Sequence, residues 1–251
     1  METDKKIIIV TGHSTGLGKY IYDRFRIEEE NRFTNIKVCG FDLKEGIDVS
    51  SKKLEQKIKA LSKQENSNIK VLVNNAAVEH IQWIENTSYE EAVKIINYNL
   101  LGYFWTARNV IKYGMGEGGI ILNIVSIAGK SPMRASCLYN VTKAAQIMMT
   151  KQMARELADK KLSVIGFAFG KIQGTEMTRR IEAKILRVRN WTKTEADKYQ
   201  YSLIPAARAL SIEEAGDFVF CIYNYVSKWI IQTGGLSYLT GSVIDCAGGL
   251  G

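Results

Sequence analysis

Three residues of the chain, Ser126, Tyr139 and Lys143, have types and spacing that suit proton transfer. If the segment around Tyr139 is helical, its four-residue separation from Lys143 places the phenol and the ammonium on one face, one turn apart. A phenol with an ordinary pKa of about 10 is a poor acid–base catalyst at neutral pH, but a fixed cation beside it favours the phenolate. We therefore expect Lys143 to lower the pKa of Tyr139. Such a pair also arises by chance on helices, so its role depends on the elements that position it.

The composition of the chain describes one folded domain. The 251 residues are enough to bury a full core, and they include only two prolines and no Ser/Gly-rich or charged tract typical of a linker. Hydrophobic residues make up 46% and charged residues 24%, which is ordinary for a globular protein. We expect a single domain over residues 1–251.

The charge and the rarer residue types exclude several classes of partner. The formal charge of +8 suggests nucleic acid, but acids and bases are mixed along expected helices, as in residues 24–30, and no zinc-finger or RNA-binding motif is present. No apolar run approaches the roughly 20 residues that cross a bilayer, and the first residues lack a secretory pattern. Four separate cysteines and only two histidines argue against disulfides and a zinc site. We expect a cytoplasmic protein without nucleic-acid, membrane or metal partners.

A glycine-rich turn follows the first expected strand. The β-branched run Ile7–Val10 leads into Thr11–Gly18, with glycines at positions 12, 16 and 18, and a helical pattern continues to about Glu29. A strand that enters such a turn and leaves as a helix presents backbone N–H groups to an anion such as a dinucleotide pyrophosphate. The spacing G-x-x-x-G-x-G matches the general dinucleotide fingerprint only in part, and the alternative is a glycine turn without a ligand.

The second expected strand, residues 36–41, ends at Asp42, where an acidic residue accepts hydrogen bonds from the adenosine ribose. A carboxylate there repels a 2′-phosphate, which favours NAD over NADP, although Lys44 is a nearby cation. Asp48 follows after a short link, which predicts a shortened or missing second crossover. Asp48 either lies near the adenine or is a turn acid before the next helix.

The remaining segments alternate between strand and helix character. Expected strands cover residues 69–73, 118–125, 162–168 and 242–246, and expected helices cover residues 52–61, 88–115, a segment through Tyr139 to about 160, and residues 212–226. Asn74, Asn75 and Ser126 stand at strand ends, and Asn99 marks an expected bend in the 88–115 segment. This alternation predicts an α/β fold, a Rossmann-type doubly wound parallel sheet flanked by helices, with its site at the carboxyl strand ends.

With these pieces in place, the sequence resembles the short-chain dehydrogenase/reductase family over almost its whole length. The resemblance is carried by Thr11-Gly12-x-x-x-Gly16-x-Gly18, Asn74-Asn75-Ala76, Asn99, Ser126, Tyr139-x-x-x-Lys143, and the closing Thr240-Gly241 and Gly248-Gly249. Each motif alone is weak, but six in the right order are specific. Ala77 departs from the usual glycine, Phe169-Gly170 stands where Pro-Gly is common, and Thr175 comes one residue late.

The resemblance implies roles for individual residues. Tyr139 would exchange the proton, Lys143 would hold the nicotinamide ribose, and Ser126 would hydrogen-bond to the substrate oxygen. Asn99 would hold a water between Lys143 and solvent, or be a satisfied amide in a bent helix. The implied cofactor-binding set is Gly12, Ser14, Thr15, Gly16, Leu17, Gly18, Asp42, Asp48, Asn75, Ala76, Tyr139, Lys143, Gly170, Ile172 and Thr175.

The function implied is an NAD(H)-dependent oxidoreductase that interconverts a secondary alcohol and a ketone, for example of a steroid, a sugar or a hydroxy acid. The alternative is a non-catalytic dinucleotide-binding sensor or scaffold. A homodimer or homotetramer is implied, formed through helices near residues 100–115 and 137–157. Residues 171–210 are expected to form a substrate lid, whose basic stretch Arg179–Lys193 either binds an acidic substrate or is a solvated helix face. Further candidates for substrate contact are His80, Gln82, Trp83, Pro132, Met133 and Arg134.

Overall fold

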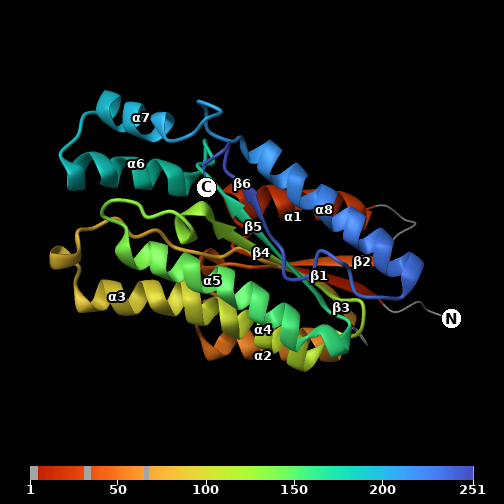
Figure 1. The fold of residues 1–251 in the computed structure, drawn as a ribbon. Helices are drawn as coiled ribbons and strands as arrows, with labels where there is room; N and C mark the ends of the chain where they lie inside the picture. The colour runs from red at the N-terminus through yellow and green to blue at the C-terminus, as the bar shows by residue number, and fades with distance from the viewer. Residues whose placement is uncertain (1–4, 31–34, 65–67, 251) are drawn as a thin grey trace.

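Six parallel strands form the centre of the computed structural model, which describes residues 5–30, 35–64 and 68–250. Their bounds are β1 (Lys6–Thr11), β2 (Ile36–Phe41), β3 (Asn68–Asn74), β4 (Ile120–Ser126), β5 (Ser163–Phe169) and β6 (Val243–Cys246). The order across the sheet is β2-β1-β3-β4-β5-β6, so the direction of winding reverses between β1 and β3 (Figure 1). In such sheets ligands bind in the crevice at the carboxyl ends beside that reversal.

Helices cover both faces of this sheet (Figure 1). One face carries α1 (Gly16–Glu30) and α8 (Ile212–Thr233), which pack against each other. The other face carries α2 (Lys52–Gln64), α4 (Gly102–Tyr113) and α5 (Cys137–Glu156), and α3 (Tyr89–Ile96) extends α4 beyond the sheet. The pair α6 (Glu176–Arg189) and α7 (Lys193–Ser202) lies beyond the carboxyl ends of the strands. The predicted Rossmann-type fold is confirmed.

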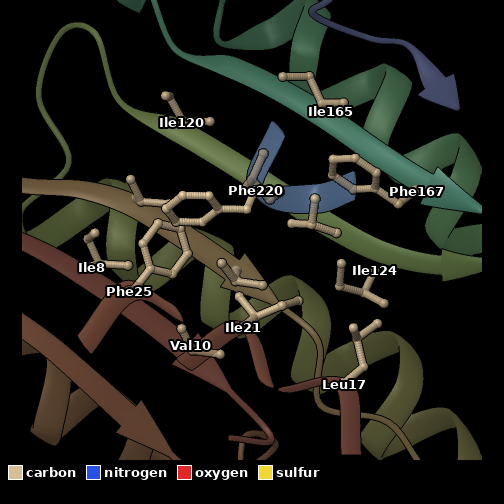
Figure 2. Packing of buried hydrophobic residues seen from close by; sticks show 14 of the residues in the cluster. Ile8, Val10, Leu17, Ile21, Phe25, Ile120, Ile124, Ile165, Phe167 and Phe220 are labelled. Carbon is tan, nitrogen blue, oxygen red and sulfur yellow. The ribbon is translucent and has the colours of Figure 1, made fainter. Parts of the chain in front are cut away.

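Two apolar clusters hold the layers together. One lies between the sheet and α1 and α8, where Phe25, Phe167 and Phe220 pack among aliphatic side chains (Figure 2). The other lies beneath α2, α4 and α5 and includes Leu54 and Ile121. The central strands β1, β3, β4 and β5 are therefore buried on both faces, which explains their largely apolar runs. Each such side chain contributes on the order of 1.5–3 kcal/mol through burial.

The connection between β2 and β3 begins with a short turn and then contains a complete helix. Between Asp42 and Asp48 the chain forms only a 3₁₀ turn, Leu43–Glu45, which agrees with the short link read from the sequence. The crossover itself is not missing, because α2 follows it and returns the chain to a strand parallel to β1. The expectation of a missing crossover was therefore wrong.

The bend expected around Asn99 is a π-helical turn, Asn97–Leu101, between α3 and α4. A π turn widens the helix and frees backbone groups from the regular ladder, and such turns are frequent at functional sites. The start of α3 is fixed by a capping box in which Ser88 and Glu91 exchange side-chain and backbone hydrogen bonds. Asn99 therefore lies in an irregular, π-helical turn between two regular helices.

Candidate active site

The glycine turn after β1 has a backbone conformation that favours glycine at two positions. Gly12 and Gly16 adopt φ angles of +68° and +56°, in the left-handed region. Gly18, in the first turn of α1, lies so close to the glycine turn that a Cβ there would lie 2.1 Å from the backbone oxygen of Gly12. The absence of a side chain at Gly18 therefore lets the first turn of α1 pack against the glycine turn, and the N–H groups at a helix N-terminus attract an anion. This cradle fits the pyrophosphate of a dinucleotide.

The turn is tied to the end of β3 by side chains of Thr11 and Asn75. Asn75 Nδ2 donates to the backbone oxygens of Thr11 (3.0 Å) and Gly12 (3.2 Å). The Thr11 hydroxyl accepts from the backbone N–H groups of Asn75 and Ala76, each at 3.0 Å. Thr11 was part of the motif but not of the predicted site set. Its position at the end of a buried strand, directly before the first glycine, is the sequence signal for this bracing role.

Asp42 reaches the same turn from the end of β2. Its carboxylate accepts from the backbone N–H of Ser14 (3.2 Å) and from that of Lys44 (2.8 Å). The Lys44 ammonium lies 3.5 Å from Glu176, so its charge is shared with an acid of α6. Asp42 is thus fixed beside the glycine turn, and its carboxylate would face the ribose of a dinucleotide bound at that turn.

Asp48 has a different environment. Its carboxylate accepts from the backbone and side chain of Ser50, at 2.8 and 2.7 Å, and from the Tyr98 hydroxyl at 3.2 Å. These are the contacts of a turn acid before α2, one of the two alternatives for this residue. Its neighbours Ile47 and Val49 line the central cavity, whereas Asp48 does not.

The glycine turn, Asp42 and the Ser–Tyr–Lys set share one cavity of about 490 Å³. Most of the predicted site residues line it: Gly12, Thr15, Gly16, Leu17, Gly18, Asp42, Asn75, Ala76, Ser126, Tyr139, Lys143, Gly170, Ile172 and Thr175. Ser14, Asp48 and Asn99 do not line it. The backbone N–H of Ser14 donates a hydrogen bond to the Asp42 carboxylate, and Ser14 lines a second, shallower hollow.

Asn99 is fully buried, and its side chain is used within the protein. Its oxygen accepts from Val78 N–H (2.8 Å), and its nitrogen donates to the Val78 oxygen (2.9 Å) and to the Thr142 hydroxyl (3.4 Å). These bonds hold the loop after β3 against α5. They are the contacts of a satisfied amide in a bent helix, the second reading of this residue.

The link from Lys143 to Asn99 runs through a residue absent from the predicted set, Gln146. Lys143 Nζ donates to Gln146 Oε1 at 2.9 Å, and Gln146 Nε2 donates to the backbone oxygen of Asn99 in the π turn. Gln146 is fully buried and Lys143 is 3% exposed. Gln146 follows Lys143 by three residues and so shares its helix face, which is the sequence signal that could have found it.

Ser126 and Tyr139 line the same cavity as Lys143. Ser126 ends β4, where its hydroxyl accepts from Ala128 N–H (3.2 Å) and donates to the Phe169 oxygen (3.3 Å). A hydrogen bond between the Ser126 and Tyr139 side chains lowers the pKa of the phenol. The Lys143 ammonium lies 5.7 Å from the centre of the Tyr139 ring. The three residues are therefore brought together as predicted.

Burial shifts the pKa values of Tyr139 and Lys143 in the protein without cofactor. Desolvation by burial raises the pKa of Tyr139 to about 12, despite the opposing hydrogen bond from Ser126. Burial also lowers the pKa of Lys143 to about 7. In the protein alone, burial outweighs any lowering by Lys143, because loss of water disfavours the charged form of both groups. The lowering of the Tyr139 pKa by Lys143 together with the cationic nicotinamide ring stays a prediction. Without its ligands, the protein holds the phenol as a proton donor.

Several expected substrate contacts lie outside the cavity. Trp83 packs in an apolar cluster under α6, and its indole nitrogen donates to the Val188 oxygen at 2.9 Å. His80 is 7% exposed and, with Gln82 and Arg134, does not line the cavity, so these expectations were wrong. The tertiary reason is that the loop after β3 is covered by α6. Pro132 and Met133 do line the cavity, as expected.

Within the part of the chain that the structure describes, no helix is both long and apolar enough to cross a bilayer. Over the same residues no three His, Cys, Asp or Glu side chains gather where they could hold a metal ion. All four cysteines are free thiols.

Comparison with known proteins agrees with this fold. A family model described as short chain dehydrogenase matches residues 6–186. The diacetyl reductase [(S)-acetoin forming] of Staphylococcus epidermidis is 30% identical, over 73% of this chain and 77% of its own. The sorbitol-6-phosphate 2-dehydrogenase of Klebsiella pneumoniae is 29% identical, over 97% and 95%. The ligand-free aldohexose dehydrogenase of Thermoplasma acidophilum superimposes with a TM-score of 0.78 at 25% identity, covering 98% of this chain and 94% of that one.

The chain therefore belongs to the short-chain dehydrogenase family. It is an oxidoreductase of that family, whose members bind nicotinamide dinucleotides and act on small molecules. The glycine cradle, in which a Cβ at Gly18 would obstruct the turn, is the feature of this structure that fits such a cofactor.

Proposed function

We propose that the protein is an NAD(H)-dependent oxidoreductase that interconverts a secondary alcohol and a ketone of a small molecule. The observation that carries this proposal is the single cavity whose wall joins the glycine turn to Ser126, Tyr139 and Lys143. A site that held only a dinucleotide would not need a proton donor at the far end of the same cavity. The named relatives, which include a diacetyl reductase and a sugar-phosphate dehydrogenase, support the same type of reaction.

In this proposal a bound nicotinamide would supply the hydride chemistry, and the residues of the chain manage the proton and the developing charge on the substrate oxygen. During reduction, Tyr139 Oη gives its proton to the carbonyl oxygen, and during oxidation it takes the proton from the hydroxyl. Ser126 hydrogen-bonds to the same oxygen, and that bond strengthens as negative charge grows there. Lys143 holds the ribose and supplies positive charge beside the phenolate. Asn99 positions Lys143 through its backbone oxygen and Gln146.

The pKa values of the pair suit the reducing direction at neutral pH. A phenol with a pKa of about 12 keeps its proton until a stronger base develops, and the oxygen of a ketone receiving hydride is such a base. Oxidation requires the phenolate, so it needs positive charge in the cavity. Protonated Lys143 is the group of this chain that provides it, which its pKa of about 7 permits at and below neutral pH.

For the cofactor, Asp42 supports NAD. A carboxylate fixed beside the glycine turn by Ser14 and Lys44 accepts hydrogen bonds from ribose hydroxyls and repels a 2′-phosphate.

We expect NADH to bind at least about 10-fold more tightly than NADPH, a preference worth about 1.4 kcal/mol. In Asp42→Asn, which keeps the side-chain shape, the preference should fall below about 3-fold. Fluorescence titration of both nucleotides measures it. Equal affinities in the wild type would refute the assignment, and Asp23→Asn on the surface of α1 is the control.

The reaction itself is tested by NADH titration together with NAD reduction over a panel of secondary alcohols, sugars and hydroxy acids. We expect saturable NADH binding and turnover with at least one class of the panel. The competing function, a non-catalytic sensor or scaffold, predicts binding without turnover throughout. That result, repeated with ketones and NADH in the reverse direction, would overturn the enzymatic proposal.

The lid, the assembly and the location follow from the same proposal. Residues 171–210 would cover the substrate, and Arg180 would anchor α6 through its ion pair, at 3.0 Å, with the largely buried Glu79.

A homodimer or homotetramer would bury apolar side chains left exposed on α4 and α5, among them Trp105, Val141 and Met148, which are 40%, 55% and 62% exposed. We place the protein in the cytoplasm, where its four free thiols stay reduced.

A further inference from the structure

Arg189, in the last turn of α6, lines the same cavity as Tyr139. The residue is only 9% exposed. Its guanidinium carbon lies 5.0 Å from the centre of the Trp191 ring and 5.6 Å from that of Tyr199. Rings at these distances fix the orientation of the guanidinium by cation–π attraction, but they supply no negative charge.

The polar contacts of Arg189 leave its charge without a counter-ion. Its Nη2 atom donates to the backbone oxygen of Arg134, and its Nε atom is buried without a hydrogen-bond partner. In the described part of the chain no carboxylate lies within ion-pair distance of this guanidinium. The neighbouring charge is the like charge of Arg134, and burial lowers the pKa of Arg189. A buried charge in this state is costly unless a partner arrives.

Three other cations of the cavity wall, Lys44, Lys171 and Arg180, have such partners, whereas Lys143 belongs to the proposed catalytic set. Arg180 pairs with Glu79 at 3.0 Å, and Lys171 lies 2.8 Å from Glu182. Arg187 belongs to the same helix turn as Arg189 but is exposed to solvent. The basic stretch 179–193 is therefore not uniform. Most of it is paired or solvated, as one of the two alternatives for this stretch supposed, and Arg189 is the member that is both buried and directed to the cavity.

We propose that Arg189 binds an oxyanion of the substrate, a carboxylate or a phosphate ester, on the molecule whose alcohol or ketone reaches Tyr139. This inference rests on the function proposed above. An arginine offers a planar set of N–H donors that matches a carboxylate or phosphate. The substrate is then a hydroxy or keto acid, or a phosphorylated polyol or sugar, held at both ends of the cavity.

The competing account is that Arg189 only clamps Trp191 and Tyr199 between α6 and α7. That role needs the cation and its stem but no anion, so the two accounts differ in what a bound oxyanion does. Trp191 itself reports on the outcome, because an anion at Arg189 arrives within a few ångströms of its indole.

The first measurement is binding, without turnover. Malonate and inorganic phosphate are titrated into the NADH-saturated protein at constant ionic strength, with tryptophan fluorescence as the readout. We expect saturable binding of at least one anion by the wild type and by Arg187→Gln, and loss of about 10- to 100-fold in affinity in Arg189→Gln. Arg189→Lys, which keeps the charge and the stem, should retain part of the affinity. It also provides the test if Arg189→Gln fails to fold, with circular dichroism and NADH binding checking each variant.

The second measurement compares substrates in matched pairs: 3-hydroxybutyrate with its methyl ester, and sorbitol 6-phosphate with sorbitol. We expect the charged member of at least one pair to have the higher kcat/KM, by about 10-fold or more, and Arg189→Gln to remove that advantage mainly through KM. Equal losses on both members of a pair, or a wild type that prefers neutral members, would overturn the anion site. Anion binding with no turnover of any compound would instead refute the redox proposal and leave the oxyanion site standing.

Discussion

Tyr139→Phe is expected to lower kcat by about 10²- to 10⁴-fold, the range that a positioned acid–base group contributes. Phenylalanine keeps the ring and removes only the hydroxyl that carries the proton. The Ser126 hydroxyl keeps its bonds to Ala128 and Phe169, so the pocket wall should stay in place. Steady-state kinetics on a substrate found by the panel measures the loss.

Two accompanying results make the Tyr139 test specific. NADH affinity should change little, because the phenol hydroxyl belongs to the reacting end of the cavity and not to the glycine turn. Tyr225→Phe on the exposed side of α8, whose side chain lies outside the cavity, should have wild-type kinetics. Tyr139→Phe turning over at close to the wild-type rate would contradict the mechanism.

Lys143→Met should also reduce kcat by at least about 10²-fold, because it removes the charge that stabilises the phenolate and the group that holds the ribose. Unlike the Tyr139 variant, it should weaken NADH binding as well. Methionine keeps most of the buried stem, so the packing of α5 against the sheet is preserved. Lys151→Met, on the exposed side of the same helix, is the matched control and should leave turnover unchanged.

The same variant has a second, independent signature in stability. Burial lowers the folded-state pKa of Lys143 from 10.5 to about 7, so between those values the unfolded chain binds the proton and the folded chain does not. The free energy of unfolding must therefore rise with pH in that window, and the destabilisation is fully present below pH 7. From pH 7 to pH 9 the ligand-free wild type should gain about 2 kcal/mol relative to Lys143→Met in urea unfolding. Parallel pH dependences would show that Lys143 is not titrating in this way.

The contact between Lys143 and Gln146 gives these expectations a physical basis. A primary ammonium has three donors, and here one of them is committed to an amide that is itself fixed by the π turn at Asn99. The ammonium is thus held at one place in the wall, and among residues 5–30, 35–64 and 68–250 no carboxylate forms an ion pair with it. In the proposed mechanism its charge is therefore available to the phenolate and to the ribose.

Residue types and their order were enough to predict the fold and the type of site. The alternation of β-branched runs with helical patterns requires a parallel sheet, because strands buried on both faces need helices on both sides. Ser126 at a strand end and the glycines after Thr11 follow from that sheet, since parallel strands bring their carboxyl ends to one edge. The bend at Asn99 was also predictable, because a buried amide among apolar neighbours needs partners that a regular helix does not provide.

The tertiary structure decided what depends on distant segments and on the loss of water. Burial raises the pKa of Tyr139 and lowers that of Lys143, and burial is a property of the packed molecule. The cover of His80 by α6, the bridge from Gln146 to Asn99, and the difference between buried Arg189 and exposed Arg187 arise in the same way. The sequence by itself determined which chemistry the chain carries. Only the packing of α6 and α7 beyond the carboxyl ends of the strands decided which basic side chain of residues 179–193 is buried at the cavity wall without an acid, because desolvation and through-space pairing are set by neighbours far apart along the chain.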